Sequence, residues 1–397
     1  MAEVLRAGAG VVWAVLLAGI LYAQKPAVDQ AWDLLAQEKR TEAIALLRQE
    51  IRKHPANADA RLLLGSLLAE AGETADAIAQ LREGVRLRPG SAVAHNGLGE
   101  ALSDAGDLTA AQTAFRKAIE LDPRFAQARE NLAVVLLESG DAAGAAEQLD
   151  RAIRLFGETE ASAYSRYLRA RVYTDSGEPE KAEAELRRAV ALRSGYAEAW
   201  SDLGQARRNL GDDAGAAAAL ERAVEINPDG AVARTRLGSL YLQMARAADA
   251  VRHLEQAARL SPDDQTALNS LQLALRETGQ TARADEVKSR LAEIFRTRDR
   301  ASQNALAAVR LNNEGAELEK KGNLAAAAEK YLAALKLNAG HAGIRVNYAV
   351  ALLRLGRWET GLTELRAAVR QDPSNQKFRR ALEDALAQAP PTLRDPK

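Results

Sequence analysis

The sequence predicts an all-α protein in which pairs of helices stack along the chain as a solenoid. Proline recurs with a period of about 34 residues at Pro55, Pro89 and Pro123, and the same interval separates Pro228 from Pro262. Small residues recur at constant distances before these prolines along nearly the whole chain. A constant period of this length is typical of repeat proteins, in which each unit buries its apolar face only against its neighbours.

Three columns of small residues accompany the prolines. One is a glycine seventeen residues before the proline position, at Gly72, Gly106, Gly140, Gly177, Gly211, Gly279, Gly322 and Gly356. An alanine stands twelve residues before that position, as at Ala77 and Ala111, and a second small residue follows seven later, as at Ala118. Agreement of several columns at one period predicts a single helix pair repeated many times.

Each column has a physical reason within a helix pair. Apolar residues three and four apart, such as Leu63 and Leu67, form a helical stripe. Helix-interior glycines such as Gly204 remove a side chain where a second helix crosses closely, at a cost of about 1 kcal/mol relative to alanine. Turn glycines such as Gly106 suit a left-handed residue that ends a helix, and proline closes the second helix.

This pattern resembles the tetratricopeptide repeat, which reads W-x2-L-G-x2-Y, then A-x3-F, then P, over about 34 residues. The sixth unit carries it at Trp200, Leu203, Gly204, Ala216, Leu220, Ala223 and Pro228. In the third unit His95 stands where tryptophan would, and in the first unit Glu38 replaces the turn glycine. The resemblance implies a right-handed superhelical α-solenoid of about ten helix-turn-helix repeats with a C-terminal capping helix.

The period slips twice, which divides the chain into segments. The proline position recurs after 37 residues between Gly157 and Ser194, and it recurs after 43 residues between Arg296 and Ala339. The predicted segments are a signal peptide or N-terminal anchor (1–23), repeats 1–4 (24–157), repeats 5–8 (158–298), an insertion (299–307), repeats 9–10 (308–375), the capping helix (376–389) and a tail (390–397). The insertion is compatible with an extended helix or an ordered connection.

The amino terminus predicts export from the cytoplasm. Residues 7–23 are seventeen uncharged residues, of which 11–22 are densely apolar. A spanning helix needs roughly 20 such residues, whereas the core of a signal peptide needs roughly 7 to 15. We therefore expect a cleaved signal peptide and a periplasmic protein, with an uncleaved inner-membrane anchor as the alternative. A lipoprotein is excluded because the chain has no cysteine.

Composition argues against several classes of function. The 54 Lys and Arg residues balance 54 Asp and Glu residues, so the bulk cationic charge that nucleic acid binding requires is missing. Cysteine ligands and thiol nucleophiles are absent, and the four histidines lie in four different units. No phosphate-binding, nucleophile-elbow or zinc-protease motif occurs. We expect no cofactor, no metal, no catalytic residue and no small-molecule substrate, and hence not an enzyme.

The resemblance also implies where a partner binds. In this family the second, fifth, ninth and twelfth residues of the first helix of each unit line the concave groove. Those positions in the middle of the array are Tyr164, Tyr167, Arg171, Thr174, Ser201, Gln205, Arg208, Thr235, Ser239 and Asn269. Two tyrosines beside an arginine are typical anchors of protein interfaces. The alternative is a solvated polar face in which both tyrosines belong partly to the core.

These observations predict a non-enzymatic scaffold that acts outside the cytoplasm of a bacterium. Its expected partner is a protein or an extended peptide held in the groove, in association with a membrane complex of the cell envelope. One alternative is a repeat subunit of a machine that exports or assembles polysaccharide or pili. A glycan transferase that carries such repeats is disfavoured, because only a short tail follows the capping helix.

Overall fold

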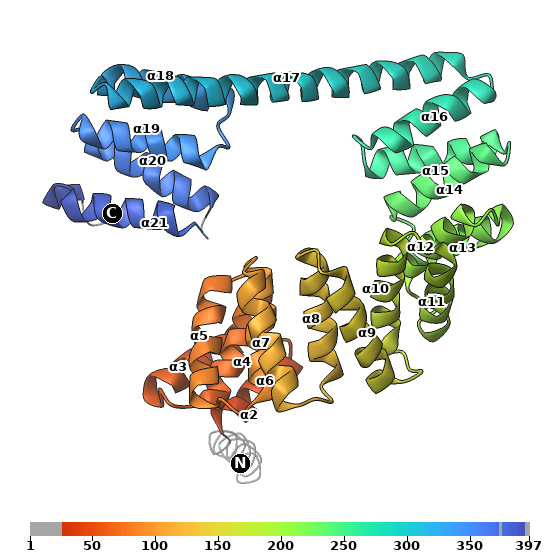
Figure 1. Ribbon diagram of the computed structural model, residues 1–397, viewed down its shortest axis with the longest axis horizontal. Coiled ribbons are helices and arrows are strands. Elements are labelled where there is room, and N and C mark those ends of the chain that lie inside the picture. The colour runs from red at the N-terminus through yellow and green to blue at the C-terminus, as the bar shows by residue number, and fades with distance from the viewer. Residues whose placement is uncertain (1–25, 373–374, 394–397) are drawn as a thin grey trace, which may run out of the picture. The chain divides into compact units, whose positions relative to one another are not determined.

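The computed structural model describes residues 26–372 and 375–393, and within these ranges the chain is helical, without a strand (Figure 1). The predicted signal or anchor at 1–23 lies outside the described residues, as does the end of the predicted tail. Among the helices of the described ranges, none combines the length and the apolar character needed to span a membrane. The chain forms two compact units, the first ending at Ala245 and the second beginning at Arg246.

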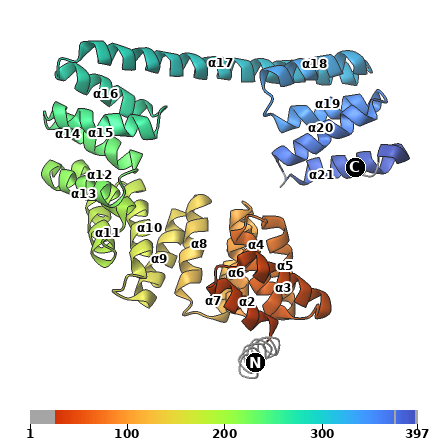
Figure 2. The ribbon, with the colours of Figure 1, turned by 180° about the vertical axis from the view of Figure 1, so that it is seen from behind.

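The first unit is a succession of helix pairs, each packed against the next (Figures 1 and 2). Its helices are α2 (Ala27–Ala36), α3 (Arg40–Lys53), α4 (Ala58–Glu70), α5 (Thr74–Leu87), α6 (Ala92–Asp104), α7 (Leu108–Leu121), α8 (Ala126–Glu138), α9 (Ala142–Phe156), α10 (Ser162–Asp175), α11 (Pro179–Leu192), α12 (Ala197–Asn209), α13 (Asp213–Ile226) and α14 (Ala231–Gln243). The even-numbered helices are the first helices of successive repeats.

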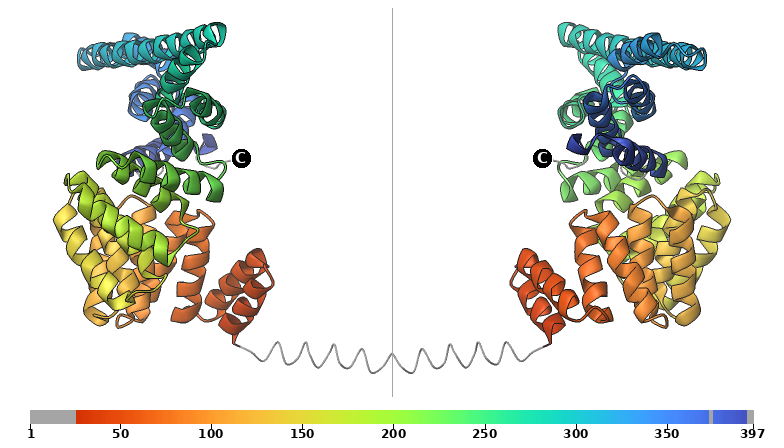
Figure 3. Two further views of the ribbon diagram at one scale, coloured as in Figure 1. Left: turned by 90° about the vertical axis from the view of Figure 1, so that its right-hand side faces the viewer. Right: turned by 90° about the vertical axis from the view of Figure 1, so that its left-hand side faces the viewer.

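The second unit contains a helix much longer than the others. Its elements are α15 (Ala247–Leu260), α16 (Gln265–Glu277), α17 (Thr281–Lys320), α18 (Leu324–Leu337), α19 (Ala342–Arg354), α20 (Trp358–Gln371), α21 (Gln376–Gln388) and a short 3-10 helix (Pro391–Leu393). Helix α17 has 40 residues, packs against α16 and against α18, and includes residues 299–307 in its middle (Figure 3). Helix α21 follows the last repeat and packs against α20.

The turn within each pair is made by a left-handed residue. Gly106 has φ 77°, and beyond it the amide of Asp107 donates to the carbonyl of Leu102 at 2.9 Å, which closes α6. The side chain of Asp107 then caps α7 by accepting from an amide three residues later. Glu38 and Ala245 hold the same place with φ 61° and 58°. A left-handed backbone costs a side-chain-bearing residue about 1 to 2 kcal/mol, and these two repeats carry that cost at an exposed turn.

Close approach of the paired helices explains the helix-interior glycines. A Cβ atom added at Gly204 would lie 2.5 Å from Cγ of Leu220, and one at Gly99 would lie 2.6 Å from the ring of Phe115. Leu220 and Phe115 are each only 1% exposed. The glycine in the first helix therefore creates the space that the large residue of the second helix fills.

The tryptophan column holds a side chain that donates a hydrogen bond. Trp200 Nε1 donates to the carbonyl of Ser194 at 2.9 Å, and Arg129 Nη2 donates to the carbonyl of Pro123 at 2.9 Å. His95 Nε2 makes the same contact with the carbonyl of Pro89 at 3.0 Å. In all three units the acceptor is the residue at the proline position. In these three units an N–H group on a bulky stem fills the column, which explains why arginine and histidine can replace tryptophan there.

Candidate functional site

The tyrosines predicted to line the groove stack on one another on α10 of the first unit. The ring centroids of Tyr164 and Tyr167 are 6.4 Å apart with an interplanar angle of 21°, and Tyr196 lies 5.1 Å from Tyr167. Burial raises the pKa of Tyr167 to about 12, with a further contribution from the charge of Asp202. Burial and the charge of Glu130 also raise the pKa of Tyr164. Both phenols therefore stay neutral at physiological pH, and both rings are half-buried, which makes them rigid amphipathic surfaces.

Two hollows beside these tyrosines bring five of the predicted residues together. One, of about 400 Å³, is lined by Arg171, Thr174 and Gln205. The other, of about 330 Å³, is lined by Tyr167 and Ser201. Arg171 is exposed and forms no hydrogen bond or ion pair within the described ranges. Among the described residues it is therefore a cation without a bonded partner beside an aromatic stack.

Two further residues line both hollows and were not predicted from the sequence. Arg236 Nη1 donates to Asp202 Oδ1 at 2.6 Å and to Ser201 Oγ at 2.8 Å, which joins α14 to α12. Asp202 and Arg236 both line each hollow. Asp202 and Arg236 each follow a predicted groove position by one residue. Their opposite charges, one repeat apart, could have indicated an ion pair between neighbouring repeats.

The remaining predicted residues lie outside these two hollows. Arg208 Nε donates to Gln243 Oε1 at 3.0 Å. Thr235 is buried and Ser239 is half-buried, and both have polar partners. Asn269 is exposed on α16, which belongs to the second unit.

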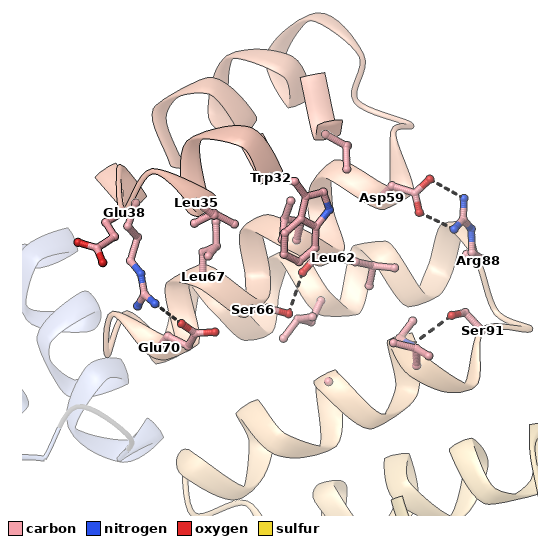
Figure 4. A pocket seen from close by; sticks show the side chains of 17 residues that line it. Trp32, Leu35, Glu38, Asp59, Leu62, Ser66, Leu67, Glu70, Arg88 and Ser91 are labelled. Atoms are coloured by element: carbon pink, nitrogen blue, oxygen red, sulfur yellow. Dashed lines mark hydrogen bonds and ion pairs between the residues drawn. The ribbon is translucent and has the colours of Figure 1, made fainter. Parts of the chain in front are cut away.

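A larger hollow, of about 920 Å³, lies between α2, α4 and α6 of the first unit (Figure 4). Its floor is apolar and includes Leu35, Leu62 and Leu67. Trp32 and Val93 border it with 57% and 71% of their surfaces exposed. Large apolar side chains that remain exposed together on one concave surface indicate an interaction site.

Ion pairs stand on opposite sides of this apolar floor, as Figure 4 shows. On one side Arg40 pairs with Glu70. On the other, Arg88 Nη2 donates to Asp59 Oδ2 at 2.8 Å in a two-pronged contact. The pairs are half-exposed, so they contribute little to stability but border the apolar floor with fixed charges.

The sequence prediction missed this hollow because its candidate binding residues all came from the middle of the array. The same positions in the first three units are Val28, Trp32, Leu35, Leu62 and Val93, together with small and polar residues. All five line the hollow. The signal was therefore present, as a run of apolar residues at positions that usually carry polar groups.

A polar network on α6, α8 and α10 ties the first helices of these units together. Asn131 Nδ2 donates to Glu100 Oε1 at 2.7 Å and to Asn96 Oδ1 at 3.1 Å. Ser165 Oγ donates to Glu130 Oε2 at 2.5 Å. Glu130 is 4% exposed, and burial raises its pKa despite the hydrogen bonds from Ser165 and Gln127. In residues 26–372 and 375–393, no cluster of three or more His, Asp or Glu side chains is placed to hold a metal.

Stacked helix pairs with a concave surface that offers apolar and polar hollows define the class of helical-repeat interaction scaffolds. Profiles described as tetratricopeptide repeat match residues 28–92, 96–159, 167–231 and 312–376, and another of the same description matches residues 210–275. These matches cover more than half of the chain, which belongs to the tetratricopeptide repeat family. The predicted all-α repeat fold is therefore confirmed, and the protein is an interaction scaffold.

Several solved structures are similar to parts of this chain. YrrB, described as a TPR protein with an unusual peptide-binding site, is 24% identical, and the match covers 48% of this chain and 96% of that one with a TM-score of 0.41. PilF of Pseudomonas aeruginosa is 19% identical, with 53% and 95% covered and a TM-score of 0.49. A tetratricopeptide repeat protein of Parabacteroides merdae is 14% identical, with 64% and 98% covered and a TM-score of 0.49. No curated protein matches this chain in sequence.

Proposed function

We propose that this protein acts outside the cytoplasm of a bacterium, as a scaffold that holds an extended peptide or protein segment in an assembly of the cell envelope. The segment binds along the first helices of the repeats in the first unit. The observation that carries the proposal is the hollow at Trp32, Leu62 and Val93, whose apolar surface is exposed where no other described part of the first unit covers it.

The size and lining of this hollow suit apolar anchor residues of a partner. Pockets for small ligands and anchor side chains span about 300 to 1,000 Å³, and this one measures about 920 Å³. Burying a large apolar side chain there contributes about 1.5 to 3 kcal/mol. Trp32 gives the partner a wide aromatic surface, and tryptophan is enriched among residues that dominate binding energy.

The hollows beside Tyr167 supply polar selectivity for the same segment. Arg171 can bind a carboxylate or carbonyl of the partner without losing an existing ion pair. The Asp202–Arg236 pair is fixed by hydrogen bonds and offers a donor and an acceptor in a constant geometry. An apolar anchor site and a polar site on one row of helices favour a segment long enough to reach both.

The proposed location is supported by the amino-terminal segment and is tested separately. Full-length protein is expressed in a bacterial host, and protease is added to spheroplasts. Digestion of the protein while a cytoplasmic marker survives is the expected result. Protection of the protein from protease until the inner membrane is lysed would overturn the extracytoplasmic assignment.

Partner binding is tested by photo-crosslinking in intact cells, followed by mass spectrometry. A photoreactive residue at position 66, in the floor of the large hollow, is combined with Trp32→Ala, and one at position 205 with Tyr167→Ala and Arg171→Ala. We expect each change to reduce the crosslinks formed at its own site at least tenfold. The matched control is Arg187→Ala with Arg188→Ala on the exposed face of α11, which should leave both sets intact. Retention of every crosslink in both groove variants contradicts the proposal.

A further inference from the structure

The middle of α17 is a single helix with exposed apolar side chains on one face. Its 40 residues span about 60 Å, and it has no buried residue between Leu291 and Ala308. Phe295, Leu306 and Val309 are 51%, 74% and 46% exposed. Leu306 and Val309 follow Phe295 by about three and four helical turns respectively, so all three lie on one face.

The positions of two of these residues are symmetric within the helix. Phe295 lies as far after the first residue, Thr281, as Leu306 lies before the last residue, Lys320. A copy of this helix that runs antiparallel and is centred on the same midpoint would place its Leu306 opposite Phe295, and the reverse contact would form at the same time. A surface that matches itself in this way is what a two-fold symmetric dimer requires.

The charges along α17 favour the antiparallel direction. Within the exposed stretch, residues 295–300 contain three Arg against one Asp, a net charge of +2. Residues 301–309 contain no charged side chain. Antiparallel helices place the basic part of each copy beside the uncharged part of the other, whereas parallel helices place the two basic parts together.

We propose that two copies of this protein associate through the middle of α17, antiparallel about a two-fold axis that passes between residues 300 and 301. The contact is limited to the exposed stretch from Phe295 to Val309, because α16 packs against the first part of the helix and α18 against the last. Phe295 of each copy fills the space beside Leu306 and Val309 of the other, where α17 and α18 border a hollow of about 700 Å³. This surface is separate from the concave groove of the first unit, so the dimer presents two grooves.

The register is tested with single cysteines, because the chain has none of its own. Ser302 and Lys288 are both exposed on α17, two helical turns after and before Phe295, and therefore lie on its face. In the proposed pair, the two copies of residue 302 lie about 4.5 Å apart along the axis, and the two copies of residue 288 lie about 38 Å apart. A short bismaleimide should therefore join two full-length Ser302→Cys chains and leave Lys288→Cys chains as monomers. Crosslinking of both variants, as parallel helices would give, or of neither, overturns the proposal.

The contribution of the apolar face is measured by sedimentation equilibrium of the full-length chain. We expect a dimer at micromolar concentrations, and at least a tenfold weaker association when Phe295→Ala and Leu306→Ala are combined. Leu273→Ala, which removes an apolar side chain of α16 that is 50% exposed, is the matched control and should leave association unchanged. Circular dichroism confirms that each variant is folded. The proposal is contradicted if the chain remains monomeric at 100 times the micromolar concentration. It is also contradicted if the combined Phe295→Ala and Leu306→Ala changes leave the dimer as stable as before.

Discussion

Arg169 in α10 and Glu314 in α17 occupy the same place in their repeats but have opposite surroundings. Each stands directly before the small residue inside the first helix, Ala170 and Gly315 respectively. In other units this place holds a buried leucine, at Leu64, Leu98, Leu132, Leu203 and Leu237. A charge in this column therefore interrupts the apolar contact with the preceding repeat.

In the fifth repeat the charge is largely covered, with 15% of its side chain exposed, and it is paired. Arg169 binds Asp150 on the preceding helix and Glu185 Oε1 at 2.7 Å, and Glu185 Oε2 also accepts from Arg166 at 3.0 Å. Burial disfavours the charged form of Arg169, but the hydrogen bonds to Glu185 and Asp150 outweigh it and raise its pKa. The neighbouring helices thus supply the partners that a buried cation needs, and stacking continues.

In the ninth repeat stacking stops. Glu314 stays 43% exposed and binds Lys330 Nζ at 2.5 Å, and this hydrogen bond lowers its pKa. Arg310 and Glu317 add charges to the same helix, and the first half of α17 carries Asp285 and Lys288, all four without burial. Arg310 pairs with Glu314, Glu317 with Lys320 and Asp285 with Arg276, and all of these pairs are exposed. A turn that brought the two surfaces together would have to bury these charges, and the chain continues as one solvated helix instead. A charge that is covered together with its partners is accommodated, whereas several exposed charges end the stack.

The largest expected effect is the loss of the buried partner in the fifth repeat. Glu185→Ala leaves Arg166 and Arg169 short of their shared carboxylate, and breaking a buried pair from one side costs about 3 to 5 kcal/mol. Glu314→Ala removes the carboxylate at the corresponding contact of the ninth repeat, where we expect no measurable change. Urea unfolding followed by circular dichroism compares the two. Similar stability of both variants would show that the fifth-repeat network is not required.

A smaller effect is expected for matched leucines of the second unit. Leu254→Ala removes a fully buried side chain of α15 and should cost about 2 to 5 kcal/mol. Leu306→Ala, in the exposed middle of α17, should change stability by no more than about 0.5 kcal/mol. Thermal unfolding is measured at nanomolar concentration, so that association does not contribute. A cost above about 1 kcal/mol for Leu306→Ala would mean that α17 is packed along its middle.

The smallest effect concerns Glu130, a buried carboxylate that accepts hydrogen bonds. Among the described residues, no cationic side chain is in contact with it. Burial raises the pKa of Glu130 in the folded chain. Ionisation of Glu130 therefore lowers the stability of the fold as the pH rises from the pKa of this group in the unfolded chain to its pKa in the folded chain. Glu130→Gln keeps an acceptor for Ser165 and should raise Tm at pH 7, with the difference vanishing below about pH 4, near the ordinary pKa of glutamate. Glu138→Gln, exposed on the same helix, is the control. A lower Tm at pH 7, or a difference independent of pH, would contradict this account.

Local spacing alone was sufficient to predict the repeat fold. Proline, turn glycine and helix-interior glycine act within one helix pair, so their columns appear in the sequence at a constant interval. The spacing also placed Glu38 at the turn-glycine position, but only the structure shows that Glu38 and Ala245 adopt a left-handed backbone there. The same holds for Arg129 and His95, whose role is defined by a carbonyl that the fold brings near.

For the candidate site, the sequence by itself determined the helical spacing, and the resemblance to the tetratricopeptide repeat supplied the positions of each first helix that are predicted to line the groove. The period slip also located extra residues at 299–307. Only the tertiary structure decided that a hollow with an apolar floor lies at Trp32 and Val93, that Asp202 joins Arg236, and that 299–307 continue a helix. These outcomes depend on contacts between residues from different repeats, where the balance of burial and pairing cannot be read from one repeat alone.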